Sequence, residues 1–275
     1  MGERAVPLNP AETCAKLLND VRSARPLVHN ITNWVVTNIT ANVTLAVGAS
    51  PVMAHAVEEA ADMVRCANAL VLNIGTLTPD IVRAMVSAGK QANSLGIPVV
   101  LDPVGVGATP LRTDSARRIL GEVRVSILRG NAAEIGILGG LGGEIKGVDS
   151  CGGTADPEIL ASTVAKAFGC VTAVTGPTDF VSDGRRLARV DNGHSLLTCV
   201  TGTGCMATSV TGAFAAVTGD YLWAATAALA CYGLAAEIAA SECAGPGSFQ
   251  VALIDSIYNL TPALVCRRAR VTVSD

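Results

Sequence analysis

Short apolar, β-branched runs alternate with longer amphipathic stretches along most of the chain. The runs predict strands, which occupy residues 26–31, 69–74, 98–101, 123–128 and 171–174. They are continuously apolar rather than alternating, which is typical of a parallel sheet covered by helices on both faces. The order of strands and helices predicts an α/β fold with a mostly parallel central sheet, built from βαβ units.

The polar residues between these runs mark helix ends and one hairpin. Thr78, followed by Pro and Asp, begins a helical pattern that ends at Gly96. The pattern over residues 156–168 likewise begins with Asp-Pro and ends before a glycine, Gly169. Two strand-like runs within residues 178–190 flank an Asp-Gly pair, which predicts a hairpin. Residues 202–260 are almost wholly helical in pattern.

Composition narrows the class of protein. The chain has 275 residues without a low-complexity linker, so we expect a single domain over residues 1–275. Half of the residues are hydrophobic and 16% are charged, which argues against disorder. The net charge is −3 and no basic run occurs, which argues against a nucleic-acid or anionic-membrane surface.

Targeting and redox signals favour a cytoplasmic protein. Residues 1–10 contain no apolar core of a signal peptide. Residues 221–236 are Ala-rich and apolar but short for a membrane span, so they predict a buried helix and no membrane association. The nine cysteines form no CxxC pair or Cys/His cluster, which favours free thiols in a reducing compartment over zinc or disulfides.

The strongest local signal is a glycine-rich turn between a predicted strand and a predicted helix. Gly202, Thr203 and Gly204 predict an anion hole, because glycines let backbone N–H groups converge at a helix N-terminus. The turn lacks the Lys-Ser/Thr of a Walker A loop. Gly202, Gly204 and Ala207 match the dinucleotide fingerprint, but that motif belongs in the first βαβ unit. A plain tight turn remains the alternative.

Cys205 follows this turn, in the first turn of the predicted helix. A helix N-terminus stabilises a thiolate, so we expect the pKa of Cys205 to be lowered. The thiol is a candidate general base or nucleophile. Ordinary core packing is the usual role of a buried cysteine.

Further candidates stand where strands end. Asp102 directly follows a strand, and Glu134 stands three residues after Asn131, so the two carboxylates could hold a hydrated Mg²⁺. Glu134 could equally complete a capping box with Asn131. Arg129 suits phosphate oxygens, and Thr175 ends another strand; both could also be ordinary strand-end residues.

The remaining segments are less specific. Residues 29–33 are dense in hydrogen-bonding side chains, so Asn33 is a candidate ligand contact or a helix cap. Met53 is a candidate packing surface for a ligand, although core packing is more usual. His55 and His194 have no evident partner and are interpreted as structural. The glycine-rich segments 139–143 and 151–153 are expected in a surface loop.

Taken together and in this order, these segments resemble the hydroxyethylthiazole kinase family of the ribokinase-like superfamily. The matching motifs are VHNITN (28–33), GASPVM (48–53), LNIGT (72–76), LDPVG (101–105), RGNAAEI (129–135), VTG (174–176) and TGTGCM (201–206). Most ribokinase-like enzymes carry Asp at the position of Cys205, whereas thiazole kinases carry Cys there.

The resemblance implies a ribokinase-like fold, ATP and Mg²⁺, and a homotrimer with active sites between subunits. The implied reaction phosphorylates the primary hydroxyl of 4-methyl-5-(2-hydroxyethyl)thiazole in thiamin salvage. It places Met53, Gly202 and more weakly Asn33 at the thiazole, and Arg129 and Thr175 at ATP. It places Asp102 and Glu134 near the Mg²⁺, and it implies that Cys205 accepts the proton of the substrate hydroxyl.

Three rival functions differ in chemistry. An ADP-dependent nicotinamide-hydrate dehydratase of the same fold usually has Asp where Cys205 stands. A dinucleotide-dependent oxidoreductase would use the Gly202 fingerprint at an unusual position. A ligand-binding or assembly protein would show no ATP turnover.

Overall fold

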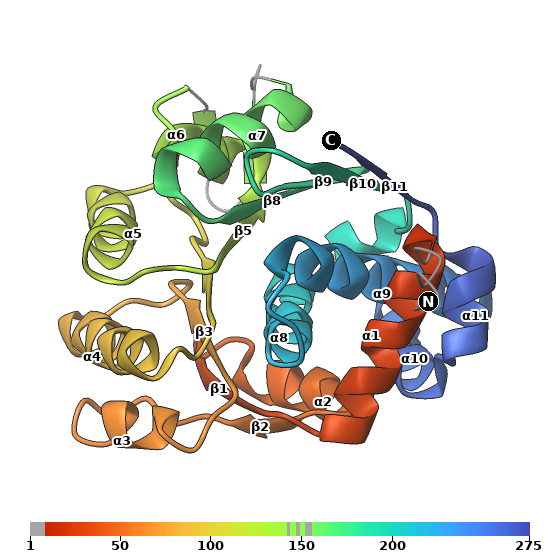
Figure 1. Ribbon diagram of the computed structural model, residues 1–275, viewed down its shortest axis with the longest axis horizontal. Coiled ribbons are helices and arrows are strands. Elements are labelled where there is room, and N and C mark those ends of the chain that lie inside the picture. Colours follow the sequence, from red (N-terminus) through yellow and green to blue (C-terminus); the bar gives the residue numbers. More distant parts are fainter. Residues whose placement is uncertain (1–8, 142–143, 147–148, 152–155) are drawn as a thin grey trace, which may run out of the picture.

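The computed structural model describes residues 9–141, 144–146, 149–151 and 156–275, and a nine-stranded sheet runs through its centre (Figure 1). The strand order is β11-β10-β9-β8-β5-β4-β3-β1-β2. The strands are β1 Leu27–Ile31, β2 Ser50–Val52, β3 Ala69–Asn73, β4 Val99–Asp102, β5 Ile127–Asn131, β8 Val171–Thr175, β9 Asp179–Ser182, β10 Leu187–Val190 and β11 Val271–Ser274.

Strands β2, β1, β3, β4, β5 and β8 are parallel to one another. Strands β9, β10 and β11 extend the sheet in antiparallel fashion. Parallel strands need crossover connections, and the helices supply them. The predicted class, a mostly parallel sheet with helices on both faces, is confirmed.

Two layers of helices cover the sheet (Figure 1). One layer contains α3 Ala60–Val64, α4 Pro79–Leu95, α5 Pro110–Glu122, α6 Ala132–Leu138 and α7 Pro157–Phe168. The other contains α1 Pro10–Ala24, α2 Thr37–Val47, α8 Thr203–Ala215, α9 Tyr221–Glu242, α10 Pro246–Asn259 and α11 Pro262–Arg268. A short 3₁₀ turn, η1 Ser195–Cys199, precedes α8.

Each layer has its own apolar core. In β3, Val71 joins the core beneath α8 and α9, whereas Leu70 and Leu72 join the core beneath α4. Successive side chains of a strand point to opposite faces, so a strand covered on both sides must be apolar throughout. All five residues of β3 are buried.

The predicted helix ends and hairpin are confirmed. The Thr78 side chain accepts a hydrogen bond from the Ile81 backbone N–H at the start of α4, and Gly96 closes the helix in the left-handed region. Helix α7 begins after Asp156 and ends before Gly169. Strands β9 and β10 pair in antiparallel fashion around the predicted Asp-Gly turn.

Three expectations need correction. The strand expected at 123–128 is Ile127–Asn131, because Val123 caps α5 instead. Strand β11 was not predicted. Residues 144–146 and 149–151 form a small antiparallel pair, β6 and β7, so Cys151, which was expected in a loop, lies in a strand. Gly142, Gly143, Gly152 and Gly153 of that expected loop lie outside the described residues.

The Ala-rich segment is a buried helix, as predicted. Helix α9 has the length and composition of a membrane span, but 83% of its apolar window lies inside the protein. The paired helices α10 and α11 meet the same test only if a bend of 108° is allowed within one span. Tight Ala packing lets α9 lie at the centre of the second helical layer.

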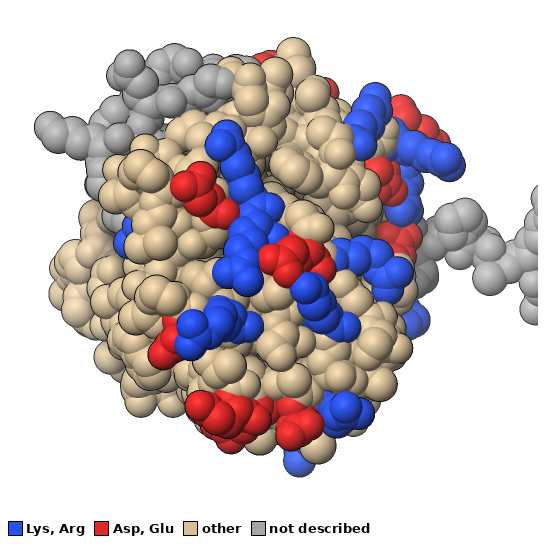
Figure 2. All heavy atoms as spheres, turned by 90° about the vertical axis from the view of Figure 1, so that its left-hand side faces the viewer, with Lys and Arg blue, Asp and Glu red and all other residues tan. Residues whose placement is uncertain are grey.

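The outer face of α3, α4 and α5 carries charges of both signs (Figure 2). Arg118 Nε lies 2.8 Å from Glu122 Oε1, and Arg65 Nε lies 3.5 Å from Asp62 Oδ1. Lys90 and Arg83 pair with Glu122 and Asp80 in the same way. Exposed pairs of this kind contribute little stability.

Candidate active site

The carboxyl ends of the parallel strands gather the residues that the sequence singled out. This edge of an open α/β sheet is where such folds place ligands. The residues at this edge, in chain order, are Asn33 after β1, Met53 after β2, Asp102 at the end of β4, Arg129 in β5, Glu134 in α6 and Thr175 at the end of β8. Helix α8, which begins at Gly202 to Cys205, packs against β1, β3 and β4.

The turn before α8 requires glycine at its first position. Gly202 has φ +86°, and a Cβ there would stand 2.6 Å from Val36 Cγ1. The Thr203 hydroxyl donates to the Leu197 carbonyl at 2.6 Å, and its own carbonyl accepts from the Tyr232 hydroxyl at 2.9 Å. The helix start is therefore fixed, and its first N–H groups have no partner within the helix. This is the property on which the predicted anion hole depends.

Arg129 lies against this helix start. Its Nη1 would stand 3.0 Å from a Cβ on Gly204, so the absence of a side chain there admits the guanidinium. Nη1 also lies 4.0 Å from Asp102 Oδ2, and the side chain is 12% exposed. Within the described part of the chain, buried Nε has no hydrogen-bond partner. A planar donor group with unused N–H groups suits phosphate oxygens.

Asp102 is a buried carboxylate with two neutral donors. Its Oδ2 accepts from Asn73 Nδ2 at 2.9 Å and from the Thr208 hydroxyl at 2.7 Å. Burial raises the pKa of Asp102, and the charge of Arg129 and these two hydrogen bonds oppose that rise. The carboxylate is held in place by neighbours that leave its charge only partly compensated.

Glu134 completes a capping box at the start of α6. Its Oε2 accepts from the Asn131 backbone N–H at 2.9 Å, and the Asn131 side chain accepts from the Glu134 N–H at 2.9 Å. Glu134 Oε1 also accepts from the Gly105 N–H at 2.7 Å. Burial, and secondly the charge of Asp102, raises the pKa of Glu134 to about 7. The capping interpretation is confirmed, and the carboxylate also fastens the loop after β4.

The two carboxylates fit a hydrated Mg²⁺ better than a fully enclosed ion. No cluster of three or more His, Cys, Asp or Glu side chains able to hold a metal occurs among the described residues. Mg²⁺ commonly binds through one or two carboxylates and keeps several waters. Because both oxygens of Glu134 already accept backbone N–H groups, Asp102 is the better candidate for direct contact.

Cys205 lies in a more enclosed setting than its place in the sequence suggested. Asn33 Nδ2 lies 3.5 Å from Cys205 Sγ. Burial, and secondly the charge of Asp102, raises the pKa of Cys205 to about 12. The prediction of a lowered pKa was wrong, because the loss of hydration and a nearby carboxylate outweigh what the helix N-terminus contributes.

Sequence reasoning missed Asn73 and Thr208 as site residues. Asn73 ends β3 as Asp102 ends the neighbouring β4, and their backbones are paired in register. Thr208 stands three residues after Cys205, so it lies on the same face of α8. Strand-end position and helical spacing were the available signals, but both are common in proteins of this class.

Met53 and Thr175 lie further out on the same edge. The Met53 carbonyl lies 3.1 Å from His55 Nδ1, and His55 Nε2 lies 3.0 Å from the Thr32 carbonyl. The His55 ring stacks on Trp34 with centroids 4.7 Å apart, so this histidine ties the Met53 segment to the Asn33 segment. The Thr175 hydroxyl donates to the Gly130 carbonyl at 3.3 Å.

His194 does not take part in this arrangement. Its side chain caps the 3₁₀ turn η1 by accepting from the Leu196 N–H at 3.2 Å. The structural interpretation of His194 is therefore confirmed.

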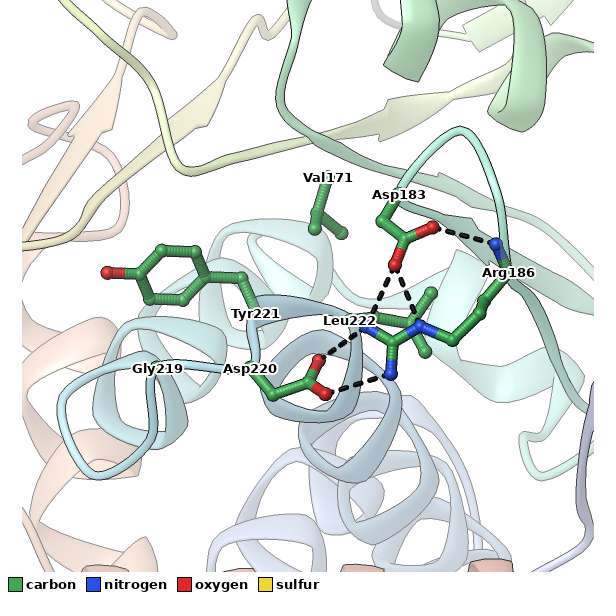
Figure 3. Close-up of a pocket in the computed structure, with 7 residues that line it drawn as sticks. All are labelled: Val171, Asp183, Arg186, Gly219, Asp220, Tyr221 and Leu222. Carbon is green, nitrogen blue, oxygen red and sulfur yellow. Dashed lines mark hydrogen bonds and ion pairs between the residues drawn. The ribbon is translucent and has the colours of Figure 1, made fainter. Parts of the chain in front are cut away.

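A depression of about 480 Å³ lies at the opposite edge of the sheet (Figure 3). Arg186 lies between two carboxylates there, with Nη1 2.8 Å from Asp220 Oδ2 and Nε 2.8 Å from Asp183 Oδ2. Its charges are paired with one another, and none of the predicted site residues lines it. We therefore place the candidate active site at the carboxyl edge.

Comparison with known proteins shows the family of the chain. The model of the hydroxyethylthiazole kinase family matches residues 18–263. The hydroxyethylthiazole kinase of Moorella thermoacetica is 58% identical over 264 residues, which cover 96% of this chain and 99% of that protein. That of Methanocella arvoryzae is 52% identical over 261 residues, covering 95% and 98%.

Solved structures show the same fold. The hydroxyethylthiazole kinase of Pyrococcus horikoshii OT3 superposes with a TM-score of 0.87 at 47% identity, covering 95% of this chain and 99% of that one. The pyridoxal kinase of Staphylococcus aureus, solved with ADP, has a TM-score of 0.58 at 15% identity, covering 77% and 87%, and shows the ribokinase-like fold alone. From the extent and identity of these matches, the chain belongs to the hydroxyethylthiazole kinase family.

Proposed function

We propose that the chain transfers the γ-phosphoryl group of ATP to the primary hydroxyl of 4-methyl-5-(2-hydroxyethyl)thiazole, a cytoplasmic step of thiamin salvage. The observation that carries the proposal is the fixed glycine-rich start of α8 beside Arg129 and Asp102, in a chain of this family. The continuous sheet supports assigning residues 1–275 to one kinase domain.

The phosphate side of the site is built from backbone and guanidinium donors. In phosphoryl transfer, positioning and charge stabilisation supply most of the rate. The N–H groups of Gly202, Thr203 and Gly204 would stabilise the charge on the transferred group. Arg129 and Thr175 would contact ATP. Asp102, with Glu134 behind it, would hold a hydrated Mg²⁺, which shields phosphate charge when bound.

The substrate side begins at Cys205. The substrate hydroxyl oxygen forms a bond to the γ-phosphorus, the bond to the bridging oxygen of ADP breaks, and the hydroxyl proton passes to the Cys205 thiolate. Because the pKa of Cys205 is about 12, little thiolate exists at neutral pH, so kcat should rise with pH. Asn33, which already contacts Cys205, and Met53 would contact the thiazole.

An apolar surface supports the proposed homotrimer with sites between subunits. Large apolar side chains are more than half exposed on or beside the paired helices α2 and α10: Trp34, Val35, Leu45, Val251 and Tyr258. Trp34 directly follows Asn33, so a second copy that covered this surface would border the site. Exposed apolar patches of this kind mark association surfaces. Light scattering of the wild type and of Tyr258→Glu would test the trimer.

ADP release with and without the thiazole tests the proposed reaction. We expect ADP only when Mg²⁺, ATP and the thiazole alcohol are present together, with mass spectrometry detecting the thiazole phosphate. NAD reduction without ADP formation would favour an oxidoreductase and contradict the proposal. Absence of any thiazole-dependent turnover would contradict it as well.

A further inference from the structure

Five side chains form a closed polar ring beneath the start of α8. Asn33 Nδ2 lies 3.5 Å from Cys205 Sγ and 2.9 Å from Asn73 Oδ1. Asn73 Nδ2 and the Thr208 hydroxyl both donate to Asp102 Oδ2, at 2.9 and 2.7 Å. Cys205 and Thr208 lie three residues apart on α8, so the helix itself closes the ring.

The orientation of the Asn73 amide is fixed from both ends. The Gly75 backbone N–H can only donate, and it lies 3.0 Å from Asn73 Oδ1. That end of the amide is therefore the oxygen, and the NH₂ end faces the Asp102 carboxylate. Asn33 must in turn present its NH₂ to Asn73 Oδ1. The second N–H of the same group is then available to Cys205 Sγ.

Little space is left for a different arrangement. Asn73 and Asn33 are 2% and 4% exposed. A Cβ on Gly75 would stand 2.5 Å from Asn33 Nδ2, so the backbone of the β3 loop presses directly on the Asn33 side chain. Without Asn73, Asn33 would lose the acceptor that sets its direction.

We propose that Asn73 is a positioning residue for phosphoryl transfer. It holds the Asn33 amide against the Cys205 thiol and holds the Asp102 carboxylate under the start of α8, through one amide group. The Cys205 thiol and the Asp102 carboxylate are thereby held at a fixed position relative to each other. The inference rests on the proposed function, because its effect is on that reaction.

Asn73→Leu, with Thr208→Val as the matched control, tests this role. Both substitutions remove one hydrogen bond to Asp102 Oδ2, but only the first also frees Asn33 from its place beside Cys205. We measure kcat, KM for ATP, KM for the thiazole and the melting temperature of each. We expect Asn73→Leu to lower kcat roughly 10- to 100-fold more than Thr208→Val, the usual loss when a residue that orients a functional side chain is removed. KM for ATP should be nearly unchanged.

A double-mutant cycle separates positioning from general damage. In a Cys205→Ala background, Asn73→Leu should lower kcat no more than Thr208→Val does, because the contact between Asn33 and Cys205 is already lost there. Equal losses in both backgrounds, or an Asn73→Leu variant no worse than Thr208→Val, would overturn the inference. If Asn73→Leu does not fold, Asn73→Ser takes its place in the same comparisons. A wild type without thiazole-dependent ADP release overturns the proposed function first, and the inference falls with it.

Discussion

The two edges of the sheet each combine an arginine with aspartates, yet they differ in how the charges are satisfied. At the carboxyl edge, Arg129 Nη1 lies 4.0 Å from buried Asp102 Oδ2, and Arg129 Nε has no hydrogen-bond partner among the described residues. At the opposite edge, Arg186 donates to both Asp183 and Asp220 at about hydrogen-bond length (Figure 3). An arginine held between two carboxylates stabilises structure, whereas one with an unused N–H group can bind a ligand.

A single strand shows the same contrast. β9 begins with Asp179 at the carboxyl edge, where the Gly176 N–H donates to its side chain, and leads into Asp183 at the other edge. Burial raises the pKa of Asp179 to about 6, although the Gly176 N–H and Arg129 oppose the rise. For Asp183, burial is outweighed by the N–H groups of Arg186 and Arg185 and by the Arg186 guanidinium, which hold its pKa below the usual range.

Replacement of Cys205 should have the largest effect. Cys205→Ala should lower kcat by roughly 10²–10⁴-fold, the span for loss of a general base, with little change in KM for ATP. Cys205→Asp should remain active, because it supplies another proton acceptor. In the wild type kcat should rise with pH, and this slope should vanish in Cys205→Ala. A fully active Cys205→Ala enzyme would leave the backbone N–H groups as the main catalytic device.

The two edges can be compared directly through one matched pair of variants. Asp102→Asn should lower kcat by about 10- to 100-fold and raise the Mg²⁺ concentration needed, because a carboxylate on the phosphate side is lost. Asp220→Asn, at the other edge, should leave kcat unchanged and cost at most ~1 kcal/mol of stability. An Mg²⁺ titration with thermal melting checks both. Unchanged Mg²⁺ dependence in Asp102→Asn would contradict its metal role.

A glycine at each edge offers a smaller test. Gly202→Ala should destabilise the fold by about 1–3 kcal/mol, because φ is +86° and the new Cβ would meet Val36. Gly219→Ala should be nearly neutral, since no atom of the described residues lies within 4 Å of its Cβ position. Chemical denaturation measures both free energies of unfolding. Equal values for the two variants would contradict the account of the turn before α8.

The smallest effect is a pair of opposite pH dependences. The pKa of Asp179 is higher in the folded state, so its contribution to stability is present below about pH 4 and is lost as pH rises through about 6. The pKa of Asp183 is lowered by folding, so its contribution is present above about pH 4 and is lost as pH falls further. Melting temperatures of Asp179→Asn and Asp183→Asn should therefore diverge from the wild type at opposite ends of the pH range. Parallel curves would contradict this difference.

Much of the fold could be predicted because its signals are local. Thr78 and Gly96 bound α4, and Asn131 with Glu134 caps α6, since these residues satisfy or permit backbone geometry within a few positions. The strand expected at 123–128 shifted because Val123 and Val125 are as apolar as a strand but pack into the core outside it. β11 went unpredicted because its pairing with β10 joins segments far apart in the chain.

The candidate site divides in the same way. The glycine turn, Arg129 and the strand-end carboxylate were identifiable from residue type and position. The state of Cys205 was not, because its pKa depends on burial and on Asp102, a hundred positions away in the chain. Asn73 and Thr208 were missed because nothing local marks them as partners of Asp102.

The sequence by itself determined which backbone groups begin and end the elements, which strands are covered on both faces, and which family the motifs resemble. Only the tertiary structure decided the protonation of Cys205, the double hydrogen bonding of Glu134 and the ring through Asn73. The physical reason is the distance along the chain over which each interaction acts. Capping and periodicity act within a few residues, whereas desolvation, charge and side-chain hydrogen bonds depend on neighbours that folding brings together.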